Sequence, residues 1–156
     1  MIKSNMLAHT HIMFTIFSIL LVNRFIEIPN LIFFAVIAMF FTLFVDIDKA
    51  SSVFGQEVWP ISLFVEKFVG HRKLFHSLVI PALLFIFLSS KGLTVYGIAV
   101  VTGYLSHLTM DTITSSGINP LWPIPIRISG PIKTGSIMEH LVFIFIVFGA
   151  LVVLFY

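Results

Sequence analysis

The chain has 156 residues, of which 58% are hydrophobic and only 10% are charged. A soluble domain of this size has about a quarter of its residues charged, so the composition excludes a soluble protein and indicates an all-α integral membrane protein. The net charge of +2 is too small to suggest a nucleic-acid partner. Because the chain has no cysteine, any metal must be bound by His, Asp and Glu. The length suits one membrane domain, residues 1–156.

Five apolar segments approach the length of about 20 residues that a membrane-spanning helix needs. In chain order they cover residues 5–25, 29–45, 73–89, 93–113 and 137–156. The first segment lacks a small-residue cleavage site, so we interpret it as a retained helix and not as a signal peptide. Pro81 falls inside the third segment and predicts a kink there.

Two long connections separate these segments. In residues 46–72 the sequence VWPISLFVEKFV combines apolar and charged side chains, which predicts a short helix lying in the membrane interface. We expect Glu57 and Glu66 in this connection to be solvated loop charges. Residues 114–136 are rich in Gly, Pro, Ser and Thr and predict a loop, with Trp122 as an interfacial anchor.

The distribution of Lys and Arg predicts the orientation, because cytoplasmic loops carry an excess of these residues. With five spans, the N-terminus and both long connections share one side, which carries Lys3, Lys49, Lys67, Arg72, Lys73, Arg127 and Lys133. The other side carries only Arg24 and Lys91. We therefore expect a multi-pass protein of the cytoplasmic (inner) membrane, with the N-terminus and both long connections in the cytoplasm.

Acidic residues and histidines from all five predicted helices collect at the cytoplasmic level. Of the seven acidic residues and six histidines, only Glu27 falls on the other side. The orientation rule explains an excess of Lys and Arg, but it does not explain this collection. Ionisable groups at membrane depth are costly and tend to be functional. A shared polyvalent cation explains their coincidence, since imidazole and carboxylate are ligands for zinc, manganese and iron.

Short spacings within this collection support the same interpretation. His107 and Asp111 are four residues apart and therefore share one helical face. The two aspartates of DID at 46–48 are two apart, so we expect one to face the bundle and the other the loop. His71 and His76 share a face only if the third helix starts after His71.

Simpler interpretations stay open for several of these residues. A lone histidine near a helix end is usually an interfacial residue, and this applies to His9 and His140. The aspartates at 46–48 could simply terminate the second helix. A buried interhelical hydrogen bond would account for His107 with Asp111.

Five pieces of the sequence occur in the order and spacing of a known family: HIMFT at 11–15, VDIDKASSVFGQ at 45–56, GHRKLFHSL at 70–78, GYLSHLTMDTITSSGINPLWP at 103–123, and Glu139. In these pieces the chain resembles the bacterial and archaeal membrane-bound, metal-dependent hydrolases, whose best-known bacterial member is LexA-regulated. The resemblance spans nearly the whole chain, and its motifs are specific in combination. Phe75 departs from the pattern, because members often have threonine there. A fainter likeness to zinc-dependent phospholipase C is an analogy only.

We expect eight residues to bind two or three divalent metal ions: His11, Asp46, Asp48, His71, His76, His107, Asp111 and Glu139. Eight ligands are too many for one tetrahedral zinc, and paired ions about 3.5–4 Å apart are usual in phosphoester hydrolysis. Zinc is the expected metal, with manganese and iron as alternatives.

Further residues are expected to act on the substrate. Asp48 is the expected general base, and Arg72 is placed to bind a phosphate oxygen in a bidentate manner. The cations expected to attract an anionic headgroup are Arg72, Lys73, Arg127 and Lys133.

These residues predict a metal-dependent hydrolase, specifically a phosphoesterase acting on a lipid or lipid-linked phosphate at the cytoplasmic membrane face. Membrane lipid is then both the solvent of the protein and its expected substrate, and the sequence carries no signal for the oligomeric state. The alternative is a transporter, an ion-conducting bundle or a structural membrane protein with a buried polar cluster. An ion pathway should place polar groups through both leaflets, whereas the outer half of every predicted helix is nearly bare of them.

Overall fold

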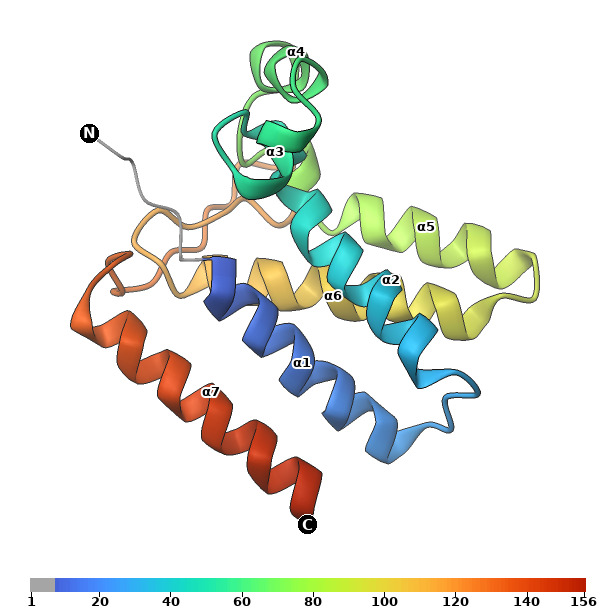
Figure 1. Cartoon of the computed structure of the whole chain (residues 1–156). Coiled ribbons are helices and arrows are strands. Elements are labelled where there is room, and N and C mark those ends of the chain that lie inside the picture. The colour runs from blue at the N-terminus through green and yellow to red at the C-terminus, as the bar shows by residue number, and fades with distance from the viewer. Residues whose placement is uncertain (1–7) are drawn as a thin grey trace.

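The computed structural model describes residues 8–156, a helical bundle from which two short helices project (Figure 1). Residues 5–7 of the first expected helix, and Lys3, lie outside the described residues. The helices are α1 (Ala8–Phe25), α2 (Leu31–Phe44), η1 (Val45–Asp48), α3 (Val53–Glu57), α4 (Ile61–Phe68), η2 (Leu74–His76), α5 (Val79–Ser90), α6 (Thr94–Thr112) and α7 (Ile137–Phe155). The described part of the chain contains no strand, so the all-α prediction is confirmed.

Helix α6 is the centre of the bundle. It packs against α1, α2 and α5, while α7 packs against α1 (Figure 1). The backbones of α2 and α6 approach closely at Gly103, where an added Cβ would overlap the carbonyl oxygen of Ala38. Phe34, Ala38 and Ala99 are fully buried beside this crossing. The crossing therefore fixes where the C-terminal ends of α2 and α6 lie.

The third predicted helix starts later than its sequence suggests. The expected segment is 73–89, but α5 begins at Val79. Before it, Arg72 has a φ of 60°, which is uncommon for any residue except glycine. The N–H of Arg72 donates to Asp48, so a side-chain contact together with the short 3-10 helix η2 holds this stretch in place of an α-helix. Pro81 consequently lies in the first turn of α5, where its missing N–H needs no partner.

The connection expected to hold one interfacial helix contains two, α3 and α4, which project from the bundle (Figure 1). The hydroxyl of Ser52 caps α3 by accepting the N–H of Gly55 at 2.8 Å. Ser62 of α4 donates to the carbonyl of Gly55 at 2.6 Å, which joins the two helices. Glu66 is not a solvated loop charge as expected, because it accepts the N–H of Ala50 at 2.8 Å.

The predicted loop between α6 and α7 is held by backbone hydrogen bonds. Isolated bridges pair Thr114 with Ile132 and Ile118 with Ile128. Ile118 is buried against Tyr104 of α6. The loop therefore packs over the C-terminal end of α6.

Two helical segments among the described residues are long and apolar enough to cross a membrane, Leu31–Asp48 and Ile137–Phe155. Helix α5 is apolar but shorter. Helices α1 and α6 have 18 and 19 residues, but they carry buried polar side chains: Thr10, His11, Thr15, Thr102, Ser106, His107 and Asp111. These inward-facing side chains lower the hydropathy of both helices.

Candidate metal centre

Seven of the eight expected ligands meet at one end of the bundle, where α1 begins and where α2 and α6 end (Figure 1). They are His11 of α1, Asp46 and Asp48 of η1, His71 and His76 before α5, and His107 and Asp111 of α6. All but Asp46 and His71 are buried. The side chains thus converge as predicted, and metal binding by them stays a prediction.

Four atoms form the centre of this cluster: Asp46 Oδ1, His76 Nε2, His107 Nε2 and Asp111 Oδ2. Each is buried and has no hydrogen-bond partner, which is unusual for buried polar atoms. The two oxygens lie 3.6 and 3.4 Å from the His76 nitrogen, and both lie 3.8 Å from the His107 nitrogen. Donor atoms bound to one zinc at about 2.0–2.2 Å lie roughly 3.3–3.6 Å apart. The distances to His76 lie within this range and those to His107 slightly exceed it. Asp46, His76 and His107 form one group whose donor atoms lie within 4.8 Å of one another, and Asp111 joins His107 in a second group with His11, so the residue types and their spacing suit divalent cations.

Hydrogen bonds on the far side of each ring orient the two histidines toward this centre. His107 Nδ1 lies 2.7 Å from the carbonyl oxygen of Thr42, which can only accept, so Nδ1 carries the proton. His76 Nδ1 lies 3.1 Å from Asp48 Oδ2 in the same manner. Histidines that bind metals typically donate their second N–H to a carbonyl or carboxylate. Each Nε2 atom is therefore directed at the centre.

Asp48 has both carboxylate oxygens engaged with neighbours. Oδ1 accepts from His71 Nδ1 at 2.8 Å, and Oδ2 accepts from His76 and from the N–H of Arg72 at 3.0 Å. Its expected roles as ligand and general base stay predictions, while its contacts are those of a residue that orients histidines. Through His71 and the N–H of Arg72, Asp48 contacts the end of the long connection, as predicted for one aspartate of the pair. Asp46 and Asp48 also face the two nitrogens of the His76 ring, because η1 lies against this buried residue.

His11 forms a second part of the cluster. Its ring stacks on His107 with a centroid separation of 4.2 Å, and its Nε2 lies 3.7 Å from Asp111 Oδ1. The other oxygen of Asp111 faces His76 and His107. A carboxylate that presents one oxygen to each of two donor sets is suited to bridge two ions.

Glu139, the eighth expected ligand, is buried and contacts the residue that precedes His11. Its oxygens accept from the N–H of Gly135 at 2.6 Å and from the hydroxyl of Thr10 at 3.3 Å. Thr10 precedes His11 in α1. Glu139 therefore ties the start of α7 to the helix that carries His11.

The structure places Arg72 in the cluster. Its Nη2 lies 3.3 Å from Asp111 Oδ2, and its Nη1 donates to the carbonyl of Gly117 at 3.0 Å. The other expected substrate cations are exposed at the surface: Lys73, Arg127 and Lys133. One of the four expected cations thus belongs to the site itself.

The electrostatics of the site favour positive charge. Burial alone lowers the pKa of His76, but the three carboxylates around its ring raise that pKa well above the ordinary histidine value. Lys49 is a residue that sequence reasoning assigned only to orientation. Burial lowers its pKa, and Asp46 and Arg72 act on it as neighbouring charges, so its side chain lies within the field of the cluster. Its position three residues after Asp46 is the sequence feature that could have indicated that Lys49 lies near the site.

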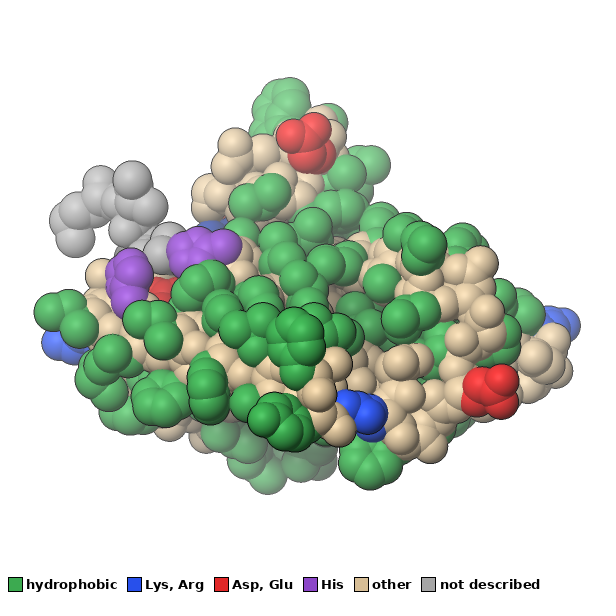
Figure 2. All heavy atoms as spheres, turned by 60° about the horizontal axis from the view of Figure 1, so that its bottom comes forward, with side chains coloured by type: hydrophobic (Ala, Val, Ile, Leu, Met, Phe, Trp, Pro, Cys, Tyr) green, Lys and Arg blue, Asp and Glu red, His purple; other side chains and the backbone are tan. Residues whose placement is uncertain are grey.

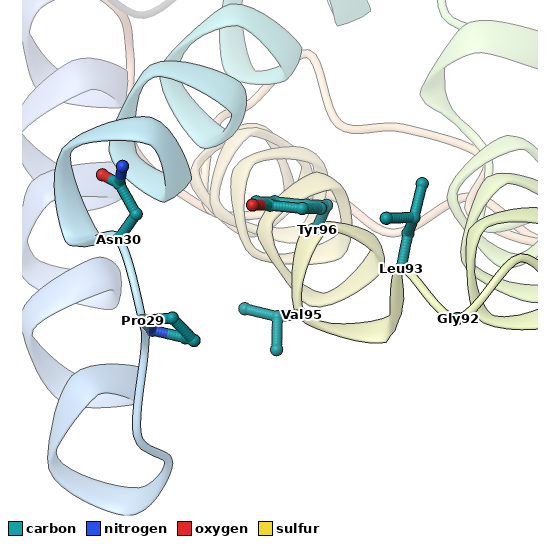
Figure 3. A pocket seen from close by; sticks show the side chains of 6 residues that line it. All are labelled: Pro29, Asn30, Gly92, Leu93, Val95 and Tyr96. Atoms are coloured by element: carbon teal, nitrogen blue, oxygen red, sulfur yellow. The ribbon is translucent and has the colours of Figure 1, made fainter.

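A surface hollow lies at the other ends of α2 and α6. Figure 3 shows its lining residues, Pro29, Asn30, Gly92, Leu93, Val95 and Tyr96. None of these side chains is acidic, basic or a histidine. The hollow therefore offers none of the chemistry that the cluster offers.

Comparison with known proteins places the chain in a family. The sequence model of the YdjM inner membrane proteins matches residues 6–156. YvsG of Bacillus subtilis, an uncharacterised protein, is 36% identical over 101 residues, which are 62% of each chain. The inner membrane protein YdjM of Escherichia coli is 35% identical over 106 residues, covering 62% of this chain and 54% of the relative.

The chain thus spans less than two thirds of the length of these curated relatives. No solved structure matches it. The name of the Escherichia coli relative gives a location in the inner membrane and no reaction. Because the family match covers nearly the entire sequence, the chain belongs to the YdjM inner membrane protein family.

Proposed function

We propose that this chain is a metal-dependent hydrolase that cleaves a phosphoester of a lipid or lipid-linked phosphate at the cytoplasmic membrane face. The observation that carries this proposal is the group of four buried donor atoms from Asp46, His76, His107 and Asp111 that make no hydrogen bond. A structural cluster would satisfy all four with hydrogen bonds, whereas here one of them, Asp111 Oδ2, has an ion pair with Arg72 at 3.3 Å but no hydrogen bond. A set made only of imidazole nitrogens and carboxylate oxygens is instead suited to a divalent metal.

The proposed site holds at least two ions. Asp46, His76, His107 and Asp111 would bind one, and His11 with the second oxygen of Asp111 would bind another. Zinc is our first choice, and manganese or iron is the alternative. Such ions would supply Lewis acidity that activates a water molecule and neutralises the charge that develops on the leaving alcohol oxygen. Asp48 holds the rings of His71 and His76 in place for this purpose.

The proposed substrate is amphipathic because the cluster combines cations with an apolar setting. The Arg72 guanidinium is directed into the cluster, where it can bind a phosphate oxygen. The helices around it are covered by hydrophobic side chains, and Figure 2 shows one such face with few charged groups. A molecule with a lipid tail and a phosphate head suits both environments.

We further propose that α1, α2, α5, α6 and α7 all span the membrane, with the cluster end in the cytoplasm. The ionisable residues within these helices, His11, His107 and Asp111, are buried inside the bundle, so they do not oppose lipid contact. The exposed His9 and Arg24 lie at the two ends of α1, where the headgroups would be. Large side chains such as Phe145 and Phe148 of α7 are 74% and 65% exposed, which suits lipid. Helix α5 has 12 residues, so the bilayer would be thinned beside it or its ends would lie among headgroups.

The test combines metal content with activity on the purified chain. We expect at least one equivalent of metal per chain by mass spectrometry. Phosphate release from phosphatidic acid or an isoprenyl phosphate should stop with a chelator and in His107→Ala and Asp111→Asn. Tyr96→Phe in the distant hollow is the matched control and should retain both properties.

Two results would contradict the proposal. Less than one equivalent of metal in an intact, folded preparation would remove its basis. Metal binding without phosphate release, combined with ion flux across reconstituted vesicles, would favour the transport alternative.

A further inference from the structure

Helix α4 has its polar side inward and its apolar side outward. Ser62 is buried and hydrogen-bonded to Gly55, and Glu66 is bonded to Ala50. On the outer side Ile61, Phe64 and Phe68 are 60%, 63% and 69% exposed. A helix on a water-facing surface shows the reverse arrangement. The outer side of α4 is therefore built for an apolar environment.

This apolar side continues the lipid-facing surface of the bundle. Phe40 of α2 is exposed, and its ring packs edge-on against that of Phe54 of α3, with 5.7 Å between the ring centroids. The ring of Phe44 in α2 also packs against that of Phe54, with 5.9 Å between the centroids. Leu31–Asp48 is one of the two segments with the properties of a membrane span. An apolar surface therefore runs from this span onto the projecting pair of helices.

Two lysines lie at the C-terminal end of α4. Lys67 is in its last turn and exposed. Lys73 is also exposed, and its side chain lies along Gly70, the residue after the helix cap Val69. Trp59, which is 63% exposed, precedes the helix. Exposed lysine and tryptophan beside an apolar helix face are typical of elements that lie at an anionic membrane surface.

We propose that the outer side of α4 binds the headgroup region of a bilayer that contains anionic lipid. Ile61, Phe64 and Phe68 enter the acyl boundary, and Lys67 and Lys73 contact lipid phosphates. The opposite side of α4 packs on η1, which carries Asp46 and Asp48. The depth at which α4 binds the bilayer therefore determines how far η1 lies from the lipid headgroups. The inference concerns location and stands without any metal or hydrolysis.

The chain contains two tryptophans, so one substitution isolates a reporter beside α4. Trp122→Phe leaves Trp59 alone, and Trp59→Phe leaves Trp122 as the comparison. The full chain is reconstituted in phosphatidylcholine vesicles with and without phosphatidylglycerol. Brominated phosphatidylcholine, labelled near either the carbonyl or the methyl end of its acyl chains, quenches tryptophan at the corresponding depth. Iodide in the buffer quenches tryptophan that water reaches.

We expect loss of Trp59 fluorescence with the shallow bromine label, little loss with the deep label, and protection from iodide. The shallow quenching should increase with phosphatidylglycerol. Phe64→Ser with Phe68→Ser should restore iodide access, whereas Leu93→Ser at the opposite end should not.

Three outcomes would overturn the proposal. Iodide quenching without bromine quenching would place α4 in water, as expected for a protein-binding surface. Stronger quenching by the deep label would place it in the hydrocarbon core. Equal quenching with and without phosphatidylglycerol would remove the anionic lipid from the assignment.

Discussion

The two ends of the α2–α6 pair differ in whether the ionisable side chains there are buried or exposed. At one end His107 and Asp111 are buried and face side chains from other elements. At the other end Arg24, Glu27 and Lys91 are exposed. Burying ionisable groups costs folding free energy, whereas exposing them costs little. The cluster end therefore lowers the stability of the fold, and the other end does not. The same helices thus serve as a site at one end and as a plain scaffold at the other.

The ends also differ in hydrogen-bond satisfaction. At the plain end Asn30 caps α2 by accepting the N–H of Phe33 at 2.9 Å, and Arg24 donates to the carbonyl of Val153 at 2.9 Å. At the cluster end four neighbouring buried donor atoms from different elements have no such partner, whereas at the plain end the Ser89 hydroxyl lacks one. Satisfied polar groups contribute stability, while buried unsatisfied ones reduce it unless a ligand engages them. This difference separates structural polarity from functional polarity.

His107→Ala should produce the largest effect, because it removes one of the central donor atoms and the stacking partner of His11. Metal content by mass spectrometry should fall below one equivalent, with an affinity loss beyond the roughly 10–100-fold typical of supporting residues. The helical circular dichroism signal should be retained. Metal content equal to that of the unmodified chain would erase the distinction between the two ends.

Asp48→Asn should weaken metal binding less, by about 10–100-fold, because it changes a residue that orients histidines. The amide cannot accept hydrogen bonds from His71, His76 and Arg72 as the carboxylate does. A competition titration with a metal-chelating dye measures the change. An effect as large as that of His107→Ala would show that Asp48 is itself a ligand, as the sequence predicts.

The sequence predicts helices well where apolar runs are uninterrupted, as in α7 and α2. It fails at α5, because contacts that are distant in sequence hold the preceding stretch. Arg72 has a positive φ and donates its N–H to Asp48, and no local sequence pattern predicts this backbone conformation or this contact. Residue type and depth predicted which side chains meet in the cluster. The acceptor of His107 is the backbone carbonyl of Thr42, which leaves no trace in residue type.

Gly103→Ala sharpens the comparison by disturbing the scaffold that joins the two ends. The added methyl group would overlap the Ala38 carbonyl and push α2 from α6, which should cost about 1–3 kcal/mol in stability. Gly149→Ala is the matched control, because the nearest atoms to its Cβ belong to the Phe17 ring, at 3.3 Å and beyond. That side chain can shift, and the gain in helix propensity is up to about 1 kcal/mol. Thermal unfolding in detergent should therefore separate the two variants, and equal midpoints would contradict the close crossing.

Asn30→Ala should have the smallest effect and should act at the plain end alone. Removing the side chain leaves the N–H of Phe33 without its cap, which typically costs about 0.5–2 kcal/mol. The unfolding midpoint should fall slightly, while the metal affinity of the folded protein should not change. Cap and cluster lie at opposite ends of α2, and nothing in the contacts of Asn30 orients a histidine. A change in metal affinity with this variant would mean that the two ends are coupled through the helix, and the division between scaffold and site would then fail.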